Sequence, residues 1–409
     1  MKYAIFLSGL AVQAAFGADP KVTDLARNGA ELRSTLKEDD LKNGRAWLGD
    51  HEQILFALVS EKTPALAVDD DKPVPMSRVE GNLWTVVVRL TPGRSHEFHY
   101  VIDGAEFGGR LANGMPIDVP VFMPSSYQQP DAPEGKMSEK LVHESKIYPG
   151  MQSDYWIYVP AQYDASKPAA LMIWQDGQGH IARNGRRTLN VLDNLTYQKR
   201  IPVMISVFIS PGKVGDKAMR SIEYDTVNDT YVRFLDELLA EVYAQYNIRK
   251  DAYSRGIAGE SSGGICAFNA AWQHPEEFSR VLSTIGSFTS IQWHPGEIDG
   301  GNVYPNKIRK EPKRNIRVYL QDGSEDLENQ FGSWPLQNIQ MANSLKLREY
   351  DFHLQFGNGT HNGADANAQL PMSLSWLWRD YNPSKTEQTY EMDPSEKTKP
   401  YFRVHIYNR

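Results

Sequence analysis

The residues best suited to chemistry lie in the stretch Ile257–Phe278, IAGESSGGICAFNAAWQHPEEF. It contains the pattern G-x-S-x-G, with Ser261 two residues from both Gly259 and Gly263. A serine on a sharp strand-to-helix turn can attack a carbonyl carbon, and glycines around it let the two backbones approach each other. Since only three positions of the pattern are fixed, the structural alternative is a glycine-rich turn with an idle serine. Partner residues elsewhere in the chain must decide between the two.

Such a serine needs a base, and the base needs an orienting acid; both follow the serine along the chain, the acid first. The segment DFHLQFGNGTHNGAD is a strand pattern that ends in a glycine-rich loop holding His361. His353 lies inside that strand pattern, so we expect it to be structural. An acidic loop after the apolar run 316–323 supplies the acid. We favour Asp326, and the alternatives are Asp322, Glu325 and Glu328.

Acyl transfer also needs N–H groups directed at the developing negative charge. The first donor is expected to be the N–H of Ser262, directly after the proposed nucleophile. The second should come from the loop WQDGQGH, which follows another apolar run. There Gly177 lets the backbone approach, and the N–H of Gln178 is the predicted donor.

The elements that position these residues follow from apolar periodicity. Four short runs of apolar residues are typical of parallel strands buried on both faces. Between them, Asp229–Tyr246 has apolar residues spaced for one helical face. Strands alternating with helices predict an α/β layer fold with a mainly parallel sheet. The apolar runs interpreted as buried parallel strands are 154–160, 170–174, 202–210 and 316–323.

The part of the chain ahead of these runs has a different pattern. From Gln53 to about Met123, short alternating segments separated by Pro, Gly and Asp turns predict a β-sandwich. The residues before Gln53 are charged and weakly patterned. The expected boundaries are a β-sandwich module at 45–124, a polar linker at 125–140, a catalytic domain at 141–383 and an unplaced C-terminal tail at 384–409.

Composition supports a globular protein of more than one domain. The chain has 409 residues, which suggests two domains. Its net charge of −7 argues against binding to nucleic acid. The single cysteine, Cys266, excludes an intrachain disulfide, and we expect it to be buried in a helix. The proposed chemistry requires no metal and no organic cofactor, and the oligomeric state is not readable from the sequence.

The N-terminus has the features of an export signal. Lys2 precedes an apolar run from Ala4 to Phe16, and small residues suit cleavage after Gly17. We therefore expect residues 1–17 to be a cleaved signal peptide, too short to remain as a membrane span, and the mature protein to be secreted or periplasmic. An uncleaved or lipid-anchored N-terminus is the alternative.

Several segments together resemble the enterochelin esterase-like, or esterase D-type, family of α/β-hydrolases. They are Arg220–Val242, GESSGGICAFNAAWQHPEEFSRVLSTIGSF, DGSEDLEN and GTHNG, in the order in which that family uses them. The preceding module resembles the immunoglobulin-like, early-set sandwich of such esterases. The resemblance covers Gln53–Asn382.

The resemblance implies a Ser261–His361–Asp326 triad, oxyanion donors at Ser262 and Gln178, and a substrate bound near Arg220 and Trp174. Structural alternatives are an ion pair of Arg220 with Glu223 or Asp225, and a core position for Trp174. The implied substrates are the ester bonds of catecholate siderophores. Feruloyl or acetyl esters of plant polysaccharides, acyl transfer, and a non-catalytic glycan-binding protein are the competing possibilities.

Overall fold

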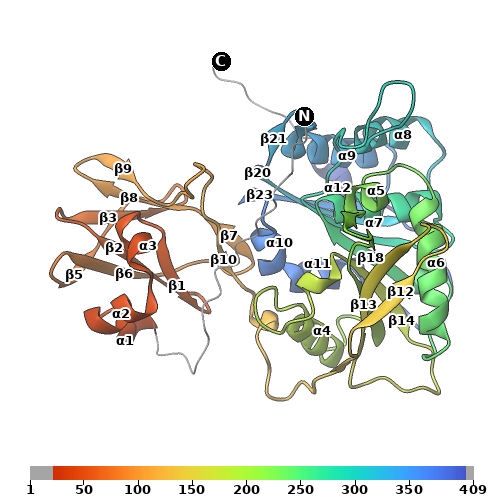
Figure 1. Ribbon diagram of the computed structural model, residues 1–409, viewed down its shortest axis with the longest axis horizontal. Helices are drawn as coiled ribbons and strands as arrows, with labels where there is room; N and C mark the ends of the chain where they lie inside the picture. Colours follow the sequence, from red (N-terminus) through yellow and green to blue (C-terminus); the bar gives the residue numbers. More distant parts are fainter. Residues whose placement is uncertain (1–21, 402–409) are drawn as a thin grey trace. The chain divides into compact units, whose positions relative to one another are not determined.

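The chain forms two compact units, Met1–Phe122 and Met123–Arg409. A computed structural model describes residues 22–401 of the chain (Figure 1). The proposed signal peptide lies outside the described residues, as does the end of the C-terminal tail.

The first unit contains three short helices and ten strands within the described residues. Their bounds are α1 Val22–Leu25, α2 Gly29–Thr35, α3 Glu38–Lys42, β1 Ala46–Asp50, β2 Gln53–Val59, β3 Pro64–Val68, β4 Val74–Pro75, β5 Ser77–Glu80, β6 Leu83–Arg89, β7 Arg94–His96, β8 Phe98–Ile102, β9 Ala105–Phe107 and β10 Val119–Val121.

Two four-stranded antiparallel sheets, β1-β2-β6-β5 and β4-β3-β8-β9, share one core in this unit. Phe56 of β2 meets Phe98 of β8 in that core, with ring centroids 4.7 Å apart. A second apolar cluster covers the opposite face of the first sheet: Leu25 and Leu32, from α1 and α2, pack with Leu55 and Leu83. The weakly patterned residues before Gln53 therefore form helices that bury a sheet face.

The second unit alternates helices and strands. The strands are β11 Lys136–Met137, β12 Leu141–Glu144, β13 Met151–Val159, β14 Ala170–Gln175, β15 Met204–Ile209, β16 Lys213–Val214, β17 Lys217–Ala218, β18 Arg255–Glu260, β19 Arg280–Thr284, β20 Arg317–Glu325, β21 Glu328–Asn329, β22 Gly332–Ser333 and β23 Asp351–Thr360. The helices are α4 Thr188–Tyr197, α5 Arg220–Tyr224, α6 Thr230–Tyr243, α7 Ser262–Gln273, α8 Tyr304–Lys310, α9 Trp334–Leu347, α10 Ala364–Ala368, α11 Leu370–Leu377 and α12 Pro394–Thr398. Short 3-10 turns occur at η1 Pro124–Ser126, η2 Gly177–Gly179, η3 Ala252–Ser254 and η4 Gly301–Val303.

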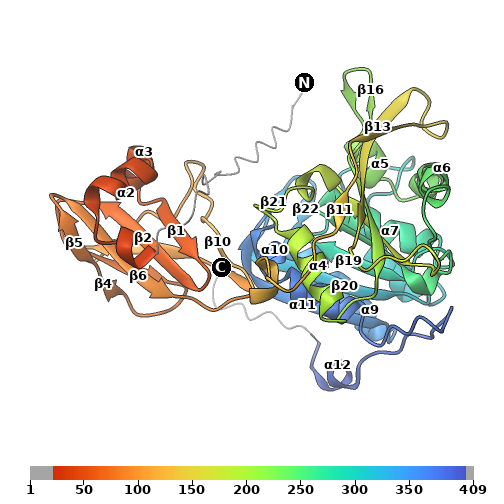
Figure 2. The ribbon, with the colours of Figure 1, turned by 90° about the horizontal axis from the view of Figure 1, so that it is seen from below.

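An eleven-stranded sheet runs through this unit in the order β17-β16-β13-β15-β14-β18-β19-β20-β23, with β11 and β12 also paired to β13. From β15 to β23 neighbouring strands are parallel. The prediction was wrong for 154–160, because β13 pairs antiparallel with β15. An apolar run indicates that a strand is buried but not whether it runs parallel to its neighbour, so the sequence could not reveal the antiparallel pairing. In Figure 2 the β16–β17 hairpin projects from the end of β13 that lies away from most of the helices.

Helices cover both faces of this sheet, so the core has two parts. Successive residues of β14 alternate between them, because side chains of a strand point to opposite faces. Leu171 and Ile173 pack in the part that holds α6 and α7, whereas Met172 and Trp174 pack in the part that holds α4 and α11. Cys266 is fully buried within α7, as expected from the sequence.

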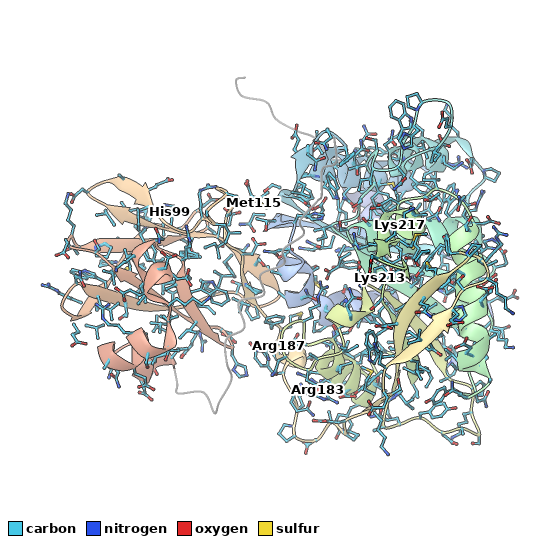
Figure 3. All side chains as sticks on the ribbon, in the orientation of Figure 1. His99, Met115, Arg183, Arg187, Lys213 and Lys217 are labelled. Atoms are coloured by element: carbon cyan, nitrogen blue, oxygen red, sulfur yellow. The ribbon has the colours of Figure 1, made fainter. Side chains whose placement is uncertain are left out.

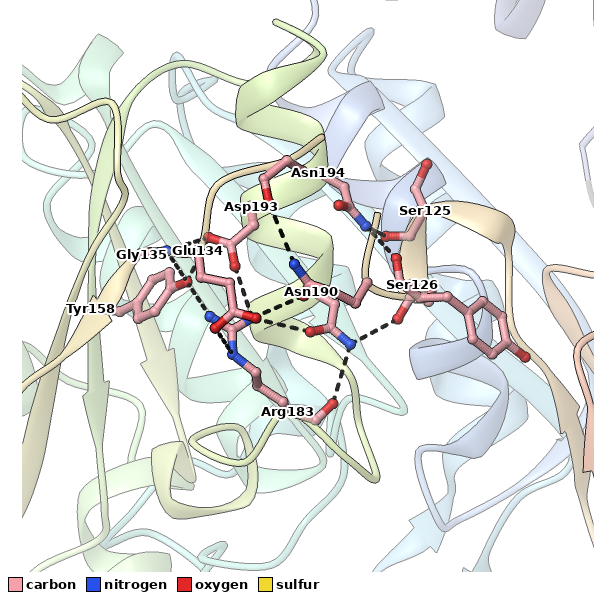
Figure 4. Close-up of polar contacts among 12 residues, drawn as sticks. Ser125, Ser126, Glu134, Gly135, Tyr158, Arg183, Asn190, Asp193 and Asn194 are labelled. Carbon is pink, nitrogen blue, oxygen red and sulfur yellow. Dashed lines mark hydrogen bonds and ion pairs between the residues drawn. The ribbon is translucent and has the colours of Figure 1, made fainter. Parts of the chain in front are cut away.

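The segment predicted to be a linker is bound to α4. The Nδ2 of Asn194 donates to the carbonyls of Ser125 and Tyr127 at 2.8 and 2.7 Å. Arg183, which lies with Arg187 in the loop before α4 (Figure 3), pairs with Asp193 at 2.8 Å. Figure 4 shows how these contacts join the loop, the helix and residues 125–135.

The C-terminal tail packs against the rest of the second unit. Tyr390 is buried, and its hydroxyl lies 2.9 Å from the Oγ of Ser279. The guanidinium groups of Arg280 and Arg317 lie 5.4 and 4.8 Å from the centre of its ring. The tail thus covers buried cationic groups near the starts of β19 and β20. No helix among the described residues is both long and apolar enough to cross a bilayer.

Candidate active site

Ser261 occupies a strained turn between β18 and α7. Its φ and ψ are 57° and −122°, a region that costs a residue with a side chain on the order of 1–3 kcal/mol. A Cβ added to Gly259 would come 2.2 Å from the carbonyl oxygen of Gly263. Strand and helix are therefore in backbone contact, which explains the glycines around Ser261 and leaves its side chain at the carboxyl edge of the sheet.

The structure brings the three predicted catalytic residues together. The Nε2 of His361 lies 2.8 Å from the Oγ of Ser261, and its Nδ1 lies 2.5 Å from Oδ1 of Asp326. Ser261 follows β18, Asp326 follows β20, and His361 follows β23. Because these strands are parallel, their carboxyl ends lie along one edge of the sheet, where loops far apart in sequence can meet.

Asp326 and Asp322, both candidates for the acid, have different environments. Asp322 lies inside β20, where its Oδ2 accepts from Nδ2 of Asn338 at 2.7 Å and its Oδ1 accepts from Gly323 N–H at 2.8 Å. Burial, and then the neighbouring Asp326, raises the pKa of Asp322 well above its usual range. Asp322 therefore holds a proton more readily than an exposed aspartate does. Asp326 is the carboxylate that contacts His361, while Glu325 and Glu328 are exposed.

The environment of His361 favours the neutral ring. Burial is the largest cause and lowers the pKa of His361 to about 4, and the positive charge of Arg220 acts in the same direction. A neutral imidazole whose Nδ1–H is held by Asp326 presents the lone pair of Nε2 to Ser261. The ring of Trp334 lies edge-on to it, with centroids 5.6 Å apart. His361 can therefore accept the Ser261 proton at neutral pH.

The loop that carries Gln178 packs closely on the neighbouring strand. A Cβ on Gly177 would lie 2.3 Å from the backbone nitrogen of Ile209, so only glycine fits there. The loop also lies against the first turn of α7, since a Cβ on Gly263 would come 3.1 Å from Oδ2 of Asp176. The first turn of a helix has N–H groups without intrahelical acceptors, and that of Ser262 is one of them. The Gln178 loop and the first turn of α7, which carry the two predicted N–H donors, are thus in contact.

Arg220 forms an ion pair that differs from both pairings considered from sequence. Its Nε and Nη2 donate to the two carboxylate oxygens of Asp176, each at 2.7 Å. Nη2 also lies 3.4 Å from the carbonyl oxygen of Glu260, the residue before Ser261. Arg220 therefore connects the Gln178 loop with the serine turn. Asp176 itself has a left-handed backbone with φ of 53°, which this bidentate pair holds in place.

Trp174 lies in the core at the end of β14. It is 2% exposed, and its ring stacks on Phe208 with centroids 5.7 Å apart. It borders a cavity of about 20 Å³, room for about one water molecule, shared with His180, Glu260 and Asn367. The core position considered from sequence is the one that the structure shows.

Sequence reasoning missed three residues beside Ser261. The Oγ of Ser287 lies 3.2 Å from that of Ser261, and Nε1 of Trp334 donates to Ser287 Oγ at 3.0 Å. Arg186 forms an ion pair with Glu260. No local motif marks these side chains, because each reaches the site from a different segment of the chain.

Comparison with known proteins fits this geometry. A family model described as putative esterase matches residues 149–377. The chain belongs to this esterase family. The match spans the segments that carry Ser261, Asp326 and His361, so the resemblance to enterochelin esterase-like proteins is confirmed at the level of the family.

Individual relatives of the esterase family are distant. The iron(III) enterobactin esterase of Escherichia coli (strain K12) is 26% identical over 198 residues, which cover 47% of this chain and 46% of that protein. The chain thus spans about half the length of the curated relatives it matches. YbbA, an uncharacterized protein of Bacillus subtilis (strain 168), is 20% identical over 183 residues, covering 42% of this chain and 68% of YbbA.

A crystal structure of the enterobactin esterase from Shigella flexneri, determined in the presence of enterobactin, superimposes with a TM-score of 0.55 at 16% identity. The alignment covers 86% of this chain and 98% of the other. At this identity the likeness shows the fold alone, and the second unit has the α/β-hydrolase fold.

Proposed function

We propose that this chain is a serine esterase that hydrolyses carboxylic esters through an acyl-enzyme. The observation that carries the proposal is the continuous contact from Ser261 through His361 to Asp326, at 2.8 and 2.5 Å. Membership of an esterase family supports the same reaction class. In this proposal Ser261 is the nucleophile, His361 the general base and Asp326 the orienting acid.

The reaction follows from the positions of the protons. As Ser261 Oγ bonds to the carbonyl carbon, its proton passes to Nε2 of His361, and the carbonyl oxygen takes up the negative charge. The N–H groups of Ser262 and Gln178 are proposed to bind that oxygen. The leaving alcohol takes the proton from His361 as the ester bond breaks. Water then repeats the cycle, releasing the carboxylic acid and restoring the Ser261 hydroxyl.

The proposed substrates are siderophore-type ester bonds, similar to those of enterobactin. The proposal rests on the names of the relatives, which act on or were crystallised with enterobactin, and on the shared fold. We assign no substrate contact to Trp174, which is buried. We propose that Arg220 chiefly holds the Gln178 loop through Asp176, because its charge is already paired.

A substrate screen with one matched variant tests the proposal. Wild type and Ser261→Ala are given a catecholate trilactone, methyl ferulate, acetylated xylan and a p-nitrophenyl ester. We expect the variant to lose about 10⁶ in turnover on every ester that the wild type cleaves. A Ser261→Ala protein with a substantial share of wild-type activity would refute the nucleophile. Cleavage of methyl ferulate without cleavage of the trilactone would replace the proposed substrate by a polysaccharide-linked ester.

We further propose that residues 1–17 direct export and are removed, and that the first unit is an immunoglobulin-like, early-set sandwich. Two antiparallel sheets around one core support the second point. Mass spectrometry of the protein from its native host tests the first. A mature N-terminus at Ala18 in the secreted or periplasmic fraction is expected, and an intact Met1 in the cytosolic fraction would contradict it.

A further inference from the structure

We propose that Ser287 is a further catalytic residue, whose hydroxyl donates a hydrogen bond to the Oγ of Ser261 throughout the reaction. This inference rests on the proposed esterase function and deepens it. In this inference Ser287 donates a hydrogen bond to the nucleophilic oxygen itself, whereas the N–H groups of Ser262 and Gln178 are proposed to bind the carbonyl oxygen of the substrate. The sequence contains no motif that would single out Ser287.

The backbone holds Ser287 firmly against the serine turn. Ser261 N–H donates to the carbonyl of Thr284 at 3.0 Å, and Ser287 N–H donates to the carbonyl of Ser261 at the same distance. Both main-chain polar groups of Ser261 are therefore bound by the end of β19 and the turn after it. Between them Ile285 has φ of 43°, a left-handed conformation that a β-branched residue rarely adopts. This turn brings residue 287 back onto Ser261.

The direction of each hydrogen bond follows from which groups can donate. An indole N–H can only donate, so Nε1 of Trp334 gives its hydrogen to Ser287 Oγ. Beyond Ser261, the Asp326 carboxylate can only accept a hydrogen bond, so the proton of the neutral His361 ring is on Nδ1. The Nε2 of His361 then has no hydrogen and must accept from the Ser261 hydroxyl. The hydroxyl hydrogen of Ser261 is thus donated to His361. The remaining hydrogen, that of Ser287, then points at Ser261 Oγ, 3.2 Å away.

These contacts form one directed chain: Trp334 to Ser287, Ser287 to Ser261, Ser261 to His361, and His361 to Asp326. Ser287 and Trp334 are 1% and 2% exposed, so solvent offers the Ser287 hydroxyl little competition. A nearby serine provides a contrast. Ser283 is also buried, but its Oγ has no hydrogen-bond partner. Burial of a serine in or just after β19 therefore does not by itself produce such a contact.

The chemical consequence concerns the charge on Ser261 Oγ. When the Ser261 O–H bond breaks and the Nε2–H bond forms on His361, electron density builds on Oγ before its bond to the carbonyl carbon is complete. A hydrogen bond to a charged oxygen is stronger than the same hydrogen bond to a neutral oxygen. Ser287 therefore stabilises the attacking oxygen, and again the leaving Ser261 oxygen when water releases the acyl group. Ser287 keeps its own proton in both steps.

The test combines a fluorophosphonate probe, which reacts with the nucleophilic serine without depending on the natural substrate, with p-nitrophenyl ester kinetics. The variants are Ser287→Ala, Trp334→Phe, the double variant, and the matched control Ser283→Ala. Ser287→Ala should lower both kcat and the labelling rate by about tenfold, because one charge-assisted bond is lost. KM and Tm should change little. Ser283→Ala should match the wild type in all four measurements.

Trp334→Phe supplies the readout that a merely structural role would not produce. It removes the indole N–H, so the Ser287 hydroxyl is free to turn away from Ser261, and we expect a loss of about threefold. In the Ser287→Ala background the same change should cost nothing further, because the bond it orients is already absent. An equal cost of Trp334→Phe in both backgrounds would overturn the inference.

The remaining outcomes separate this inference from the proposed function. If the probe labels Ser261 in the wild type but Ser287→Ala retains at least half of the labelling rate, Ser287 has no catalytic role and the esterase proposal stands. If peptide mapping finds no label on Ser261 of the wild type, the proposed function itself fails. Should Ser287→Ala not fold, Trp334→Phe decides alone, and an unchanged labelling rate in that variant overturns the inference.

Discussion

Replacing each of two neighbouring aspartates by asparagine tests which carboxyl group serves His361. The two changes are isosteric and lie four residues apart, yet the structure predicts opposite results. Asp326 is the carboxylate bound to Nδ1 of His361 at 2.5 Å, and its charge stabilises the imidazolium that forms during attack. Burial and the neighbouring Asp326 raise the pKa of Asp322 well above its usual range. Asp326→Asn therefore replaces the carboxylate that faces His361, whereas Asp322→Asn does not.

The size of the effect follows from the contacts of Oδ1. This atom accepts from both Nδ1 of His361 and the N–H of Leu327. If the asparagine oxygen keeps that position, the tautomer of His361 is preserved and only the charge is lost, at a cost of about 10² in kcat. If the amide NH2 group of the asparagine faces His361 instead, Nδ1 must accept and the ring proton moves to Nε2. The loss in kcat then approaches about 10⁴. The expected range is thus roughly 3–5.5 kcal/mol in the activation barrier.

The assay is steady-state hydrolysis of a p-nitrophenyl ester at neutral pH, with thermal unfolding as the control for folding. Asp326→Asn should lose activity within that range at nearly unchanged KM. Asp322→Asn should stay within about tenfold of the wild type, since its carboxyl group accepts from Asn338 and Gly323 while Asp326 is the group bound to His361. The reasoning is refuted if Asp326→Asn keeps more than a tenth of wild-type turnover, or if Asp322→Asn loses as much as Asp326→Asn does.

Two further predictions concern pH and the tail. Because burial lowers the pKa of His361 to about 4, the ring stays neutral down to that pH, and kcat/KM should begin to fall only near pH 4. A pH–rate profile checks this, with circular dichroism to exclude unfolding; an acid limb near 6.5, the ordinary value for histidine, would contradict it. Tyr390→Ala should destabilise the fold by roughly 3 kcal/mol, because it removes a buried ring beside Arg280 and Arg317. Urea unfolding measures the loss, and a midpoint equal to that of the wild type would show that the tail contributes nothing.

The parts of the site that could be predicted from sequence are those tied to chain order. The G-x-S-x-G turn marks Ser261, and a late strand followed by a glycine-rich loop marks His361. Local pattern could not choose between Asp322 and Asp326, since both lie where the same apolar run ends in acidic residues. That choice depends on contacts: the carboxyl inside β20 accepts from Asn338 and Gly323, whereas the one in the loop contacts His361.

What the sequence could not reveal depends on partners distant in the chain. Arg220 was considered beside the nearby Glu223 and Asp225, yet it pairs with Asp176, far earlier in sequence. Likewise, apolar periodicity shows that β13 is buried and not that it runs antiparallel to β15. In both cases the deciding contact is set by how strands are ordered in the sheet, which periodicity does not encode.

The order of strands in the sheet explains why the proposed chemistry is gathered at one edge. The strands β14, β18, β19, β20 and β23 are consecutive neighbours in the sheet and all parallel. Each is followed within three residues by one proposed group: Gln178, Ser261, Ser287, Asp326 and His361. Parallel strands place their carboxyl ends together, so every neighbouring strand can add one side chain or N–H without any loop crossing another. On this reasoning β19, the one strand of the five to which sequence motifs assign no function, is where an additional catalytic group should be sought, and Ser287 is the side chain that it delivers to Ser261.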